Sequence, residues 1–452
     1  MLRAFKRFFK RVTFSCIHTQ LHDIGGSGAA QYGGHARAPP GQAPIWPQIA
    51  RHDIADRAAH LSGAMMNPVN AVTPGPADAP FAAPSPDVLR LRAVHRAAAD
   101  LRRGTPVLLL GEAPLMLLPA ETAGARGLAE LAQAASAPPV LLLAPVRASA
   151  VLRRPVAPEV PAKALRTSPA LLAPEVLLGL ADPTAAQILP EEPMLAECPS
   201  LAPAALALVK LARLLPAVLA APAAPDAAAR AAALDLATVE AEAVLAYPLA
   251  AAAGLRRVAD VPVPLEDAPD ARIVAFRAPD SGIEHMAIVI GHPEAQDAAL
   301  VRIHSECFTG DLLGSLRCDC GDQLRGAIRR MAHEGSGVLL YLAQEGRGIG
   351  LMNKLRAYTM QDRGLDTLDA NRALGWGADE RNFLVAATML RELGIDSVRL
   401  LTNNPDKVAA LQACGLASVV REAHEIAPNG VNDRYLRTKA ERFGHLLGQH
   451  EQ

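Results

Sequence analysis

Short apolar runs that alternate with helical patterns constrain the fold of this chain most strongly. TPVLLLG (residues 105–111) and PPVLLLAPV (138–146) are continuous apolar runs bounded by Gly or Pro, which is typical of strands buried on both faces. Helical patterns occupy residues 88–104 and 226–247, and a glycine closes the first of them. These segments predict a folded α/β domain over residues 86–258.

The strongest candidate for a membrane span is ALALVKLARLLPAVLAAPAA at residues 205–224. It contains Lys210, Arg213, Pro216 and Pro222, and such charges and prolines are unfavourable within a bilayer. We therefore interpret this stretch as a pair of buried helices with a break between them. We expect no membrane partner.

The composition sets further bounds. The chain has 452 residues, 50% of them hydrophobic, and a formal net charge of −1, which fits two or three domains and gives no reason to expect a nucleic-acid partner. Six cysteines are too few for a disulfide framework, so we expect a reducing, cytoplasmic location. Residues 1–85 are rich in Gly, Pro, Ala and His, and we expect a disordered tail there. We interpret its basic start, MLRAFKRFFKRV, as a short frayed helix or a tail from an over-long gene start, and a short helix on a membrane surface is the alternative.

Chemically active residue types are sparse in the predicted 86–258 domain. It holds one histidine, one cysteine and one aromatic residue, which are His95, Cys198 and Tyr247. A lone histidine or cysteine of this kind is more often a packing or surface residue than a ligand. A Pro- and Asp-rich segment opens the domain expected over residues 259–452, which holds four of the six cysteines. We expect the function to reside in this last domain.

Three cysteines there have metal-ligand character. Cys307, Cys318 and Cys320 have the spacing C-x10-C-x-C, and thiolates are soft ligands that suit zinc. Three protein ligands leave a fourth position for water, which is the pattern of a catalytic zinc site. A closed structural site completed by His304 or His333 is the alternative. The aspartate between the last two cysteines is expected to face outward or toward the backbone of the turn.

A glycine-rich turn follows a predicted strand in GVLLYLAQEGRGIGLMNKLRAYTMQ, residues 337–361. Its glycines let the backbone approach a ligand, and the N-terminus of the next helix offers N–H groups to a phosphate. Arg347 adds a bidentate partner for a phosphate or carboxylate. The pattern matches neither the dinucleotide fingerprint nor the P-loop, so an ordinary strand-to-helix turn is the alternative.

A second candidate phosphate site lies in VRLLTNNPDKVAALQACG, residues 398–415. The pattern predicts a strand, an asparagine cap and a helix that begins at Pro405. Thr402 and Lys407 flank the start of this helix and are placed to hold a phosphate. An ordinary capped helix with a solvated lysine is the alternative.

A third helix start is predicted in GADERNFLVAATMLRELG, residues 377–394. We expect Asp379, Glu380 and Arg381 in its first turn. Acidic residues there suit the helix dipole and an arginine does not, so Arg381 invites a functional interpretation. A surface salt bridge is the alternative.

A thiolate metal site, two candidate phosphate sites and a misplaced arginine together predict metal-assisted hydrolysis of a phosphorylated substrate. The motifs RIHSECFTGD, SLRCDCGDQL, YLAQEGRGIGLMNKLRAY, GADER and LLTNNPDK, in this order, resemble GTP cyclohydrolase II, the first committed enzyme of riboflavin biosynthesis. The resemblance covers roughly residues 261–452. It implies the mixed α/β fold of that family, preceded here by a separate α/β domain and the disordered tail.

The resemblance also implies the reaction and its cofactors. GTP would be hydrolysed to 2,5-diamino-6-(5-phosphoribosylamino)pyrimidin-4(3H)-one, formate and pyrophosphate by a homodimer. One Zn²⁺ per subunit would be bound by Cys307, Cys318 and Cys320, with a zinc-bound water that attacks C8 of guanine. Mg²⁺ would assist at the triphosphate.

The resemblance further assigns roles to individual residues. Arg381 would act as a nucleophile on the α-phosphorus or as a phosphate clamp, Asp379 as a proton acceptor, and Tyr358 near the reacting carbon. Glu345 would recognise guanine and Arg347 the phosphates. The full set of implied GTP contacts is Arg302, Ile303, His304, Ser305, Glu306, Gln323, Glu345, Gly346, Arg347, Thr367, Thr402 and Lys407.

The preceding domain carries a second resemblance. Residues 93–123 resemble the opening helix and strand of 3,4-dihydroxy-2-butanone 4-phosphate synthase, but GEAPLMLL stands where that family has an acidic cluster, and an RTGHTE-like motif is missing. We interpret residues 86–258 as a degenerate, non-catalytic synthase-like domain with a structural, dimerising or regulatory role. A bifunctional synthase and cyclohydrolase, or a catalytically silent GTP-binding relative, are the alternatives.

Overall fold

The computed structural model describes residues 84–157, 160–279, 281–424, 430, 440 and 442. The chain divides into residues Met1–Pro80 and Phe81–Gln452, and only the second unit contains described residues. The tail predicted over residues 1–85, with its amphipathic start, therefore lies outside the described residues except for its last two positions. None of the described helices has the length and apolar character needed to cross a membrane.

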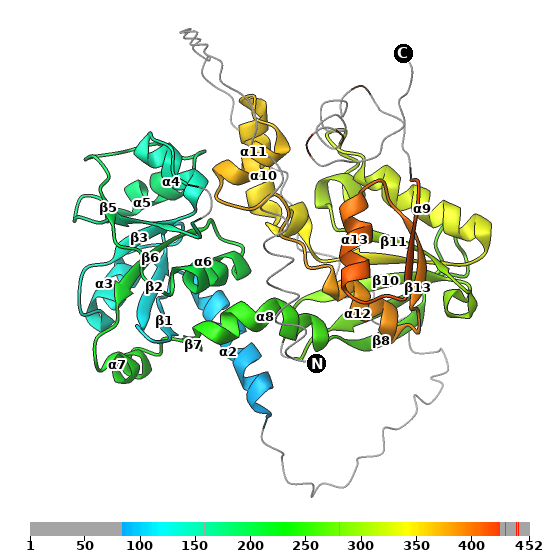
Figure 1. Ribbon diagram of the computed structural model, residues 1–452, viewed down its shortest axis with the longest axis horizontal. Helices are drawn as coiled ribbons and strands as arrows, with labels where there is room; N and C mark the ends of the chain where they lie inside the picture. The colour runs from blue at the N-terminus through cyan, green and yellow to red at the C-terminus, as the bar shows by residue number, and fades with distance from the viewer. Residues whose placement is uncertain are drawn as a thin grey trace, which may run out of the picture. The chain divides into compact units, whose positions relative to one another are not determined.

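The N-terminal half of the described chain is built on one mixed sheet. Its described strands follow the order β5-β4-β3-β6-β2-β1-β7, and β1 and β7 form its parallel pair. Figure 1 shows this sheet, with each of its strands except β4 labelled. The strands are β1 (Val107–Leu110), β2 (Leu115–Pro119), β3 (Val140–Leu143), β4 (Lys163–Arg166), β5 (Leu195–Ala196), β6 (Ala217–Pro222) and β7 (Thr238–Glu240). The helices are α2 (Pro86–Arg102), α3 (Ala125–Ala134), α4 (Pro145–Leu152), α5 (Pro174–Ala181), α6 (Ala202–Leu211), α7 (Ala227–Ala233) and α8 (Ala241–Ala253).

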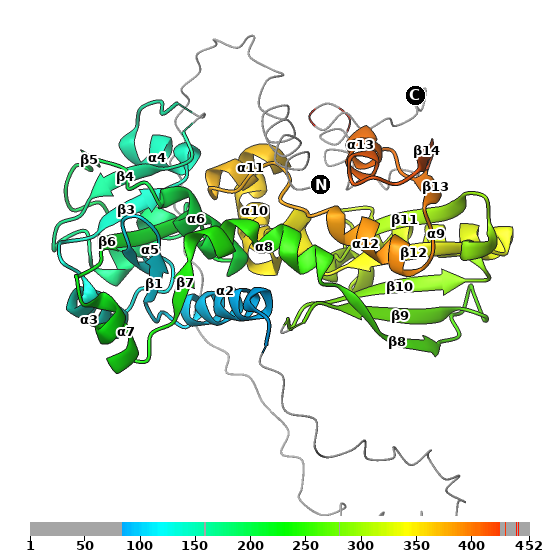
Figure 2. The same ribbon diagram turned by 60° about the horizontal axis from the view of Figure 1, so that its bottom comes forward.

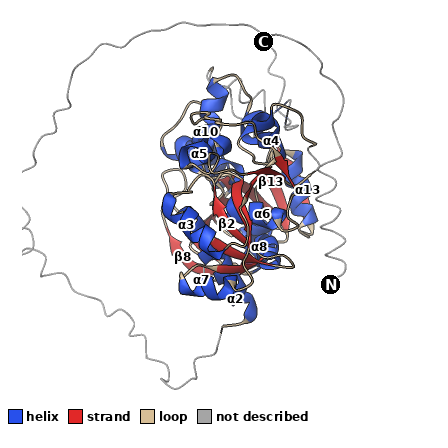
Figure 3. Ribbon diagram, turned by 90° about the vertical axis from the view of Figure 1, so that its left-hand side faces the viewer, coloured by secondary structure: helices blue, strands red, loops and turns tan. Residues whose placement is uncertain are grey.

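Both faces of this first sheet are buried, as the continuous apolar runs predict. Side chains alternate between the two faces along each strand, so Leu108 of β1 joins one hydrophobic cluster while Val107 and Leu109 join the other. Helices α2, α6 and α8 cover the face of Val107 and Leu109. Figure 3 shows helices, in blue, around the red strands.

The opposite face of the first sheet is covered partly by the C-terminal half of the chain. Besides residues of α3, α4, α5 and α7, its hydrophobic cluster contains Ala357 and Met360 of α10 (Leu351–Asp362) and Ala370 of α11 (Thr367–Ala373). Leu374 and Trp376, directly after α11, are 1% and 3% exposed in the same cluster. The two halves of Phe81–Gln452 thus share one hydrophobic core.

The C-terminal half has its own mixed sheet. Its described strands follow the order β14-β13-β11-β12-β10-β9-β8 (Figure 2). The strands are β8 (Arg256–Pro262), β9 (Arg272–Arg277), β10 (Glu284–Ile290), β11 (Ala299–Ser305), β12 (Gly337–Leu342), β13 (Ser397–Leu401) and β14 (Ser418–Glu422). The remaining α-helices described are α9 (Cys320–Glu334), α12 (Leu384–Glu392) and α13 (Pro405–Ala413).

The directions of three neighbouring strands fix where a site can form. β11 lies between β12 and β13 and is parallel to both. Because parallel strands end at the same edge of a sheet, the segments after Ser305, Leu342 and Leu401 meet there. Antiparallel strands β8, β9 and β10 extend the sheet on the other side of β12.

Several predicted elements are confirmed. The two apolar runs form β1 and β3, and the pattern at 88–104 forms α2, with Gly104 in a left-handed conformation (φ 74°). The strand, turn and helix predicted in 337–361 form β12 and α10, and those in 398–415 form β13 and α13.

Two predictions in the first half are wrong. The stretch 205–224 is helix α6 followed by strand β6, not two helices. Helix α6 ends at Leu211 and the chain turns at Arg213, whose φ of 58° is left-handed; the buried apolar run that follows could not be assigned from periodicity alone. The single helix predicted over 226–247 is α7, strand β7 and the start of α8. The break lies at Asp235, whose left-handed φ of 53° ends α7 and redirects the chain into β7.

A buried histidine on β10 ties the sheet to the segment after β12. His285 is 7% exposed, and its Nδ1 accepts a hydrogen bond from the backbone N–H of Ala343 at 3.1 Å. Burial, reinforced by the positive charge of Arg213, lowers the pKa of His285 to about 4. The folded protein therefore holds this imidazole in its neutral form.

This histidine predicts the sign of a pH dependence. The ring ordinarily titrates near pH 6.5, so between pH 6.5 and about 4 the unfolded chain binds a proton that the folded chain does not. The free energy of unfolding should therefore fall as the pH falls through this window. His285→Gln keeps an acceptor for the Ala343 N–H, but glutamine does not titrate. The free energy of unfolding of this variant, measured by urea denaturation, should therefore fall less steeply as the pH falls. The exposed His292→Gln control should follow the wild type, and an unchanged slope for His285→Gln would contradict the assignment.

Candidate functional site

A cavity lies at the edge of the second sheet where β11, β12 and β13 end. Every predicted GTP contact lines it, together with the three cysteines, Tyr358 and Arg381. Asp379 is not among its lining residues and instead contacts Arg381. The fold therefore brings together side chains that lie more than a hundred residues apart in the sequence.

The three cysteines form one cluster on the wall of this cavity. Cys307 follows β11, Cys318 precedes α9 and Cys320 begins α9, and their sulfur atoms lie within 4.8 Å of one another. The sulfurs of Cys307 and Cys318 are 3.8 Å apart. A Cβ at Gly310 would stand 2.7 Å from the Cys318 sulfur, so only glycine leaves room for the cluster at this position. Three convergent thiols are a donor set that fits a metal ion.

The closed-site alternative finds no support among the described residues. His304 Nε2 is 3.1 Å from the carboxylate oxygens of Asp311, and its ring stacks on Tyr341. His333 lies in the last turn of α9 and is exposed. Among the described residues, the potential metal ligands that lie together are the three cysteines, and neither histidine joins them.

A buried lysine outside the predicted set contacts the cluster. Lys354 of α10 donates hydrogen bonds to the Cys307 sulfur (2.9 Å), the Thr309 hydroxyl (2.9 Å) and the Glu345 carboxylate (3.0 Å). Burial opposes its charge, but the Cys307 thiolate and Glu345 outweigh this and raise the pKa of Lys354. Hydrogen bonds from Cys318, Cys320 and Lys354 in turn hold the pKa of Cys307 far below its usual range.

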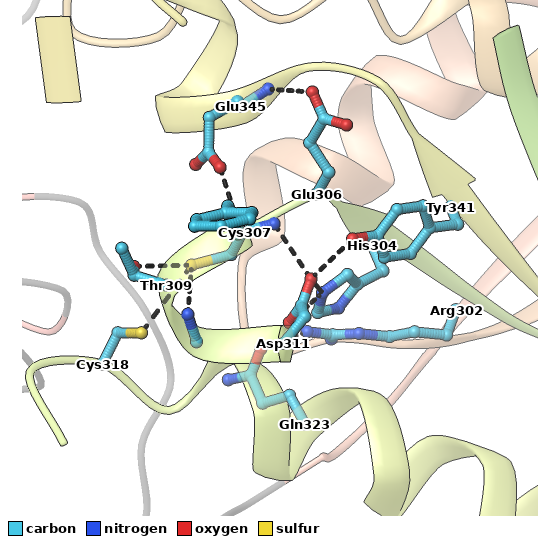
Figure 4. A network of polar contacts seen from close by, with 12 residues as sticks. Arg302, His304, Glu306, Cys307, Thr309, Asp311, Cys318, Gln323, Tyr341 and Glu345 are labelled. Atoms are coloured by element: carbon cyan, nitrogen blue, oxygen red, sulfur yellow. Dashed lines mark hydrogen bonds and ion pairs between the residues drawn. The ribbon is translucent and has the colours of Figure 1, made fainter. Parts of the chain in front are cut away.

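Asp311 fixes the turn that carries Cys307. The residues Phe308–Leu312 form a π-helical turn, and the Asp311 carboxylate accepts hydrogen bonds from the Cys307 backbone N–H (2.9 Å) and the Tyr341 hydroxyl (3.0 Å). Figure 4 shows this carboxylate between His304, Tyr341 and the backbone of Cys307. Its polar contacts hold Cys307, the first of the three cysteines, against strands β11 and β12.

Glu345 ties the glycine-rich turn to the same segment. It is 4% exposed, and its carboxylate accepts hydrogen bonds from the backbone N–H groups of Phe308 (2.7 Å) and Gly346 (2.9 Å) besides the one from Lys354. A carboxylate offers about four acceptor positions, so roughly one is left for a ligand. The predicted guanine contact of Glu345 stays a prediction.

The turn itself has a left-handed backbone. Gly346, Arg347, Gly348 and Gly350 have φ between 63° and 94°, and a Cβ at Gly348 would stand 2.8 Å from the Glu380 carbonyl oxygen. Arg347 adopts this conformation without being a glycine, which indicates that the surrounding contacts impose it. Its side chain lines the cavity.

Of the two predicted phosphate sites at helix starts, the one at α13 faces the cavity. Thr402, Asn404 and Lys407 line it, and Asn404 caps α13 by accepting a hydrogen bond from the Asp406 N–H at 2.8 Å. Lys407 is buried and donates to the Ile303 carbonyl at 3.0 Å. The first turn of α10, residues 351–353, does not contribute to the lining.

The predicted placement of the GADER motif is wrong. Asp379, Glu380 and Arg381 lie in an irregular segment before α12, which begins at Leu384, so the helix-dipole argument does not apply to Arg381. Arg381 instead forms a bidentate ion pair with Asp379, its Nε standing 2.8 Å from one carboxylate oxygen. Burial tends to raise the pKa of Asp379, but the positive charges of Arg381 and then Arg347 outweigh this effect, so that the pKa of Asp379 is lowered.

The expectation for the aspartate between the two cysteines is also wrong. Asp319 is 3% exposed and lines the cavity, and its carboxylate accepts a hydrogen bond from the Gln323 side chain at 2.6 Å. Gln323 in turn accepts from the guanidinium of Arg302, which also donates to the Leu401 carbonyl at 2.8 Å. Asp319 faces inward because the buried arginine provides the positive charge that its burial requires.

The motifs contained further site residues that spacing alone did not single out. Lys354 sits within the predicted α10 pattern, and Asp311 closes the HSECFTGD segment, so their place inside two of the motifs was the available signal. His424, directly after β14, also lines the cavity. Among the lining residues described, cationic side chains outnumber carboxylates, which suits a polyanion. The cations are Arg302, Arg317, Arg347, Lys354, Arg381 and Lys407, and the carboxylates are Glu306, Asp319 and Glu345.

His95, Cys198 and Tyr247, the isolated residues of the first half, do not line this cavity. The Tyr247 hydroxyl is 3.2 Å from His95 Nε2, and their rings meet edge to face. Cys198 is exposed. His95 is thus a packing partner of Tyr247, in line with the interpretation of an isolated histidine.

Comparison with known proteins places this site in a family. The family model of GTP cyclohydrolase II matches residues 256–423. A GTP cyclohydrolase-2 of Azospirillum brasilense is 46% identical over 393 residues, which are 82% of this chain and 100% of that protein. The riboflavin biosynthesis protein RibBA of Parabacteroides distasonis is 51% identical over 176 residues, which are 39% of this chain and 44% of that protein.

Solved structures show a weaker likeness. A two-domain 3,4-dihydroxy-2-butanone 4-phosphate synthase from A. baumannii, RibBX, covers 73% of this chain and 99% of its own, at 17% identity and a TM-score of 0.29. A likeness this weak does not assign the first sheet to a fold family. The origin of residues 86–258 as a degenerate synthase domain stays a prediction. The alignment with the Azospirillum relative runs the full length of that protein and reaches beyond residues 256–423. On this relationship, the chain belongs to the GTP cyclohydrolase II family of hydrolases.

Proposed function

We propose that this chain hydrolyses GTP to 2,5-diamino-6-(5-phosphoribosylamino)pyrimidin-4(3H)-one, formate and pyrophosphate, as the first step of riboflavin biosynthesis. The observation that carries the proposal is the convergence of three thiols and every predicted GTP contact on one cationic cavity. The similarity to the Parabacteroides protein, a riboflavin biosynthesis protein, supports the pathway.

Cys307, Cys318 and Cys320 would hold a zinc ion, since three thiolates form a soft donor set beside the space that Gly310 leaves. Zinc bound there supplies a Lewis acid that makes water nucleophilic near neutral pH. Lys354 balances the thiolate charge from the other side of Cys307. Mg²⁺ would bind through the oxygens of the triphosphate, as is usual for nucleotide substrates.

The ring-opening half of the reaction consumes two waters. They break the two C8–N bonds of the imidazole and release C8 as formate. Tyr358 lines the cavity. Its hydroxyl is 3.4 Å from the hydroxyl of Thr309, which is two residues after Cys307. Burial raises the pKa of Tyr358, so its hydroxyl is protonated at neutral pH and can donate a hydrogen bond to the reacting purine.

The second half consumes a third water and splits the α–β phosphoanhydride. The Asp379 carboxylate accepts hydrogen bonds from Nε and Nη2 of the Arg381 guanidinium. Nη1, the other terminal nitrogen, is directed away from this ion pair. A guanidinium stays protonated at any physiological pH, so it is a poor nucleophile and a good phosphate partner. We therefore favour Arg381 as a phosphate clamp that Asp379 orients. The homodimer and the cytoplasmic location stay predictions.

Product analysis tests this function directly. Zinc-loaded protein incubated with GTP and Mg²⁺ should yield the diaminopyrimidinone ribosyl phosphate, formate and pyrophosphate in equal amounts by mass spectrometry. Intact GTP beside bound zinc would instead identify a catalytically silent GTP-binding relative. Incubation with ribulose 5-phosphate tests the bifunctional alternative, for which butanone phosphate would have to appear.

Removing one thiol should remove the metal. Cys318→Ser is expected to lower the zinc content and formate release together, by roughly 100-fold for the rate, because two thiolates hold the ion poorly. Elemental analysis and the formate assay measure both quantities. Cys198→Ser, at an exposed cysteine outside the cluster, is the matched control and should change neither. Full activity of Cys318→Ser without zinc would rule out the metal assignment.

Removing Arg381 should separate the two halves of the reaction. Arg381→Ala is expected to keep its zinc but lose pyrophosphate release by roughly 100-fold, the size typical of a lost charged contact to a developing negative charge. Arg329→Ala, at a half-exposed arginine of α9, serves as control. If Arg381→Ala releases pyrophosphate at the wild-type rate, Arg381 has no role at the phosphates.

A further inference from the structure

The end of helix α6, in the domain without predicted chemistry, reaches the glycine-rich turn of the site. Arg213, two residues after α6, donates a hydrogen bond from its guanidinium to the Ala343 carbonyl at 2.9 Å. Its own backbone carbonyl accepts one from the Asn353 side chain at 3.0 Å. Ala343 precedes the turn that carries Glu345 and Arg347, and Asn353 follows it in α10. One residue thus holds both ends of this turn.

The conformation of Arg213 shows that this contact is tightly specified. Its φ of 58° is left-handed, a conformation that costs a non-glycine residue energy and persists where surrounding contacts impose it. Gly350, at the end of the turn, has a φ of 88°, and a Cβ there would stand 3.2 Å from the Arg213 side chain. Asn353 is fully buried and also donates to the Ile349 carbonyl at 2.9 Å. The two left-handed residues pack against each other directly.

A second cation at the end of α6 holds the segment with Arg381. The Lys210 ammonium is 2.5 Å from a carboxylate oxygen of Glu380, and these side chains are 29% and 25% exposed. The same Glu380 oxygen accepts a hydrogen bond from the Gly377 N–H at 2.7 Å, and the Glu380 N–H donates to the Arg347 carbonyl at 3.1 Å. Through Glu380, Lys210 therefore helps to fix the position of the backbone between Asp379 and Arg381.

A third contact orients helix α10, which carries Lys354 and Tyr358. Arg356 on this helix is 2.8 Å from Glu121 and 2.7 Å from Asp182, two carboxylates of the first half, and all three side chains are largely buried. Ala357 and Met360 of the same helix pack into the core of the first sheet. The helix that contacts Cys307 thus takes its position from the other domain.

We propose that the domain of the first sheet is a built-in positioning element of the active site, and that Arg213 and Lys210 are its two positioning residues. Arg213 sets the turn of Glu345 and Arg347, and Lys210 sets the segment of Arg381. Catalytic groups have to be held within a fraction of an ångström, so the loss of either contact should lower the rate at a site whose own residues are intact. This inference rests on the proposed function.

The test compares Arg213→Ala, Arg213→Lys and Lys210→Met in the full-length chain. Arg126→Ala, at an arginine of α3 that is 87% exposed in the same domain, is the matched control. For each variant we would measure zinc content, thermal midpoint, kcat and KM for formate and for pyrophosphate release, and the calorimetric affinity for a non-hydrolysable GTP analogue.

Positioning predicts specific results beyond lost stability. Arg213→Ala should lower kcat/KM for formate release by roughly 10- to 100-fold at unchanged zinc content, and bind the analogue more weakly. Arg213→Lys can still donate to the Ala343 carbonyl and should recover part of the loss. Lys210→Met should slow pyrophosphate release more than formate release, since it affects the segment of Arg381. Arg126→Ala should behave as the wild type.

Three results would overturn the proposal. One is that Arg213→Ala and Lys210→Met both stay within twofold of the wild type in rate and affinity. Another is that their losses match the fraction of unfolded protein, which is a stability effect alone. If Arg213→Ala does not fold, the Lys210→Met variant provides the test. The third overturning result is that Lys210→Met slows formate release and pyrophosphate release equally. A wild type that binds the analogue but releases no formate contradicts the proposed function instead, and the affinities still test the positioning.

Discussion

Met360, Leu374 and Trp376 belong to the C-terminal half of the chain, yet they are buried in one hydrophobic cluster with Leu143 and Leu177 of the first half. Burial of a large apolar side chain contributes roughly 1.5–3 kcal/mol, so this shared core is a major part of what holds α10 and α11 in place. The other face of α10 carries Lys354 and Tyr358 into the cavity. The orientation of two site residues therefore depends on a sheet that contributes no side chain to the chemistry.

Around Cys307, the site depends on buried charges that satisfy one another. The side chains of Asp311, Glu345 and Lys354 are all largely buried, and each makes two or more polar contacts, at least one of them to the segment around Cys307. A buried charge without a partner is strongly unfavourable, so these groups fix one arrangement of the turn and exclude others. The cluster of thiols then needs little further organisation. Gly310 leaves the space, and the Asp311 network holds Cys307 at its edge.

The parts of the fold that could be predicted are those whose local signal is unambiguous. The apolar runs at β1 and β3, the capped helix α13 and the strand–turn–helix of β12 and α10 carry their own start and stop signals. The segment 226–247 lacks such signals. Its alanine-rich composition fits helix throughout, and pairing with β1 in the first sheet overrides this preference to form β7. The start of α12 was misplaced for a similar reason, since contacts of Glu380 with Gly377 and Arg347 hold residues 379–381 outside the helix.

By itself, the sequence determined the kinds of chemistry available to this protein. The spacing of Cys307, Cys318 and Cys320 indicated the cluster of thiols. The motifs, in their order, indicated the family and the residues that line the cavity. Tertiary structure alone decided that Asp319 faces inward and that Lys354 contacts Cys307. It also decided that Arg213 and Lys210, from the half of the chain with the first sheet, contact the segments of the site. The physical reason is that motifs report residues close together in the chain. A buried charge is placed by whichever partner the packed sheets bring to it, and that partner can lie more than a hundred residues away.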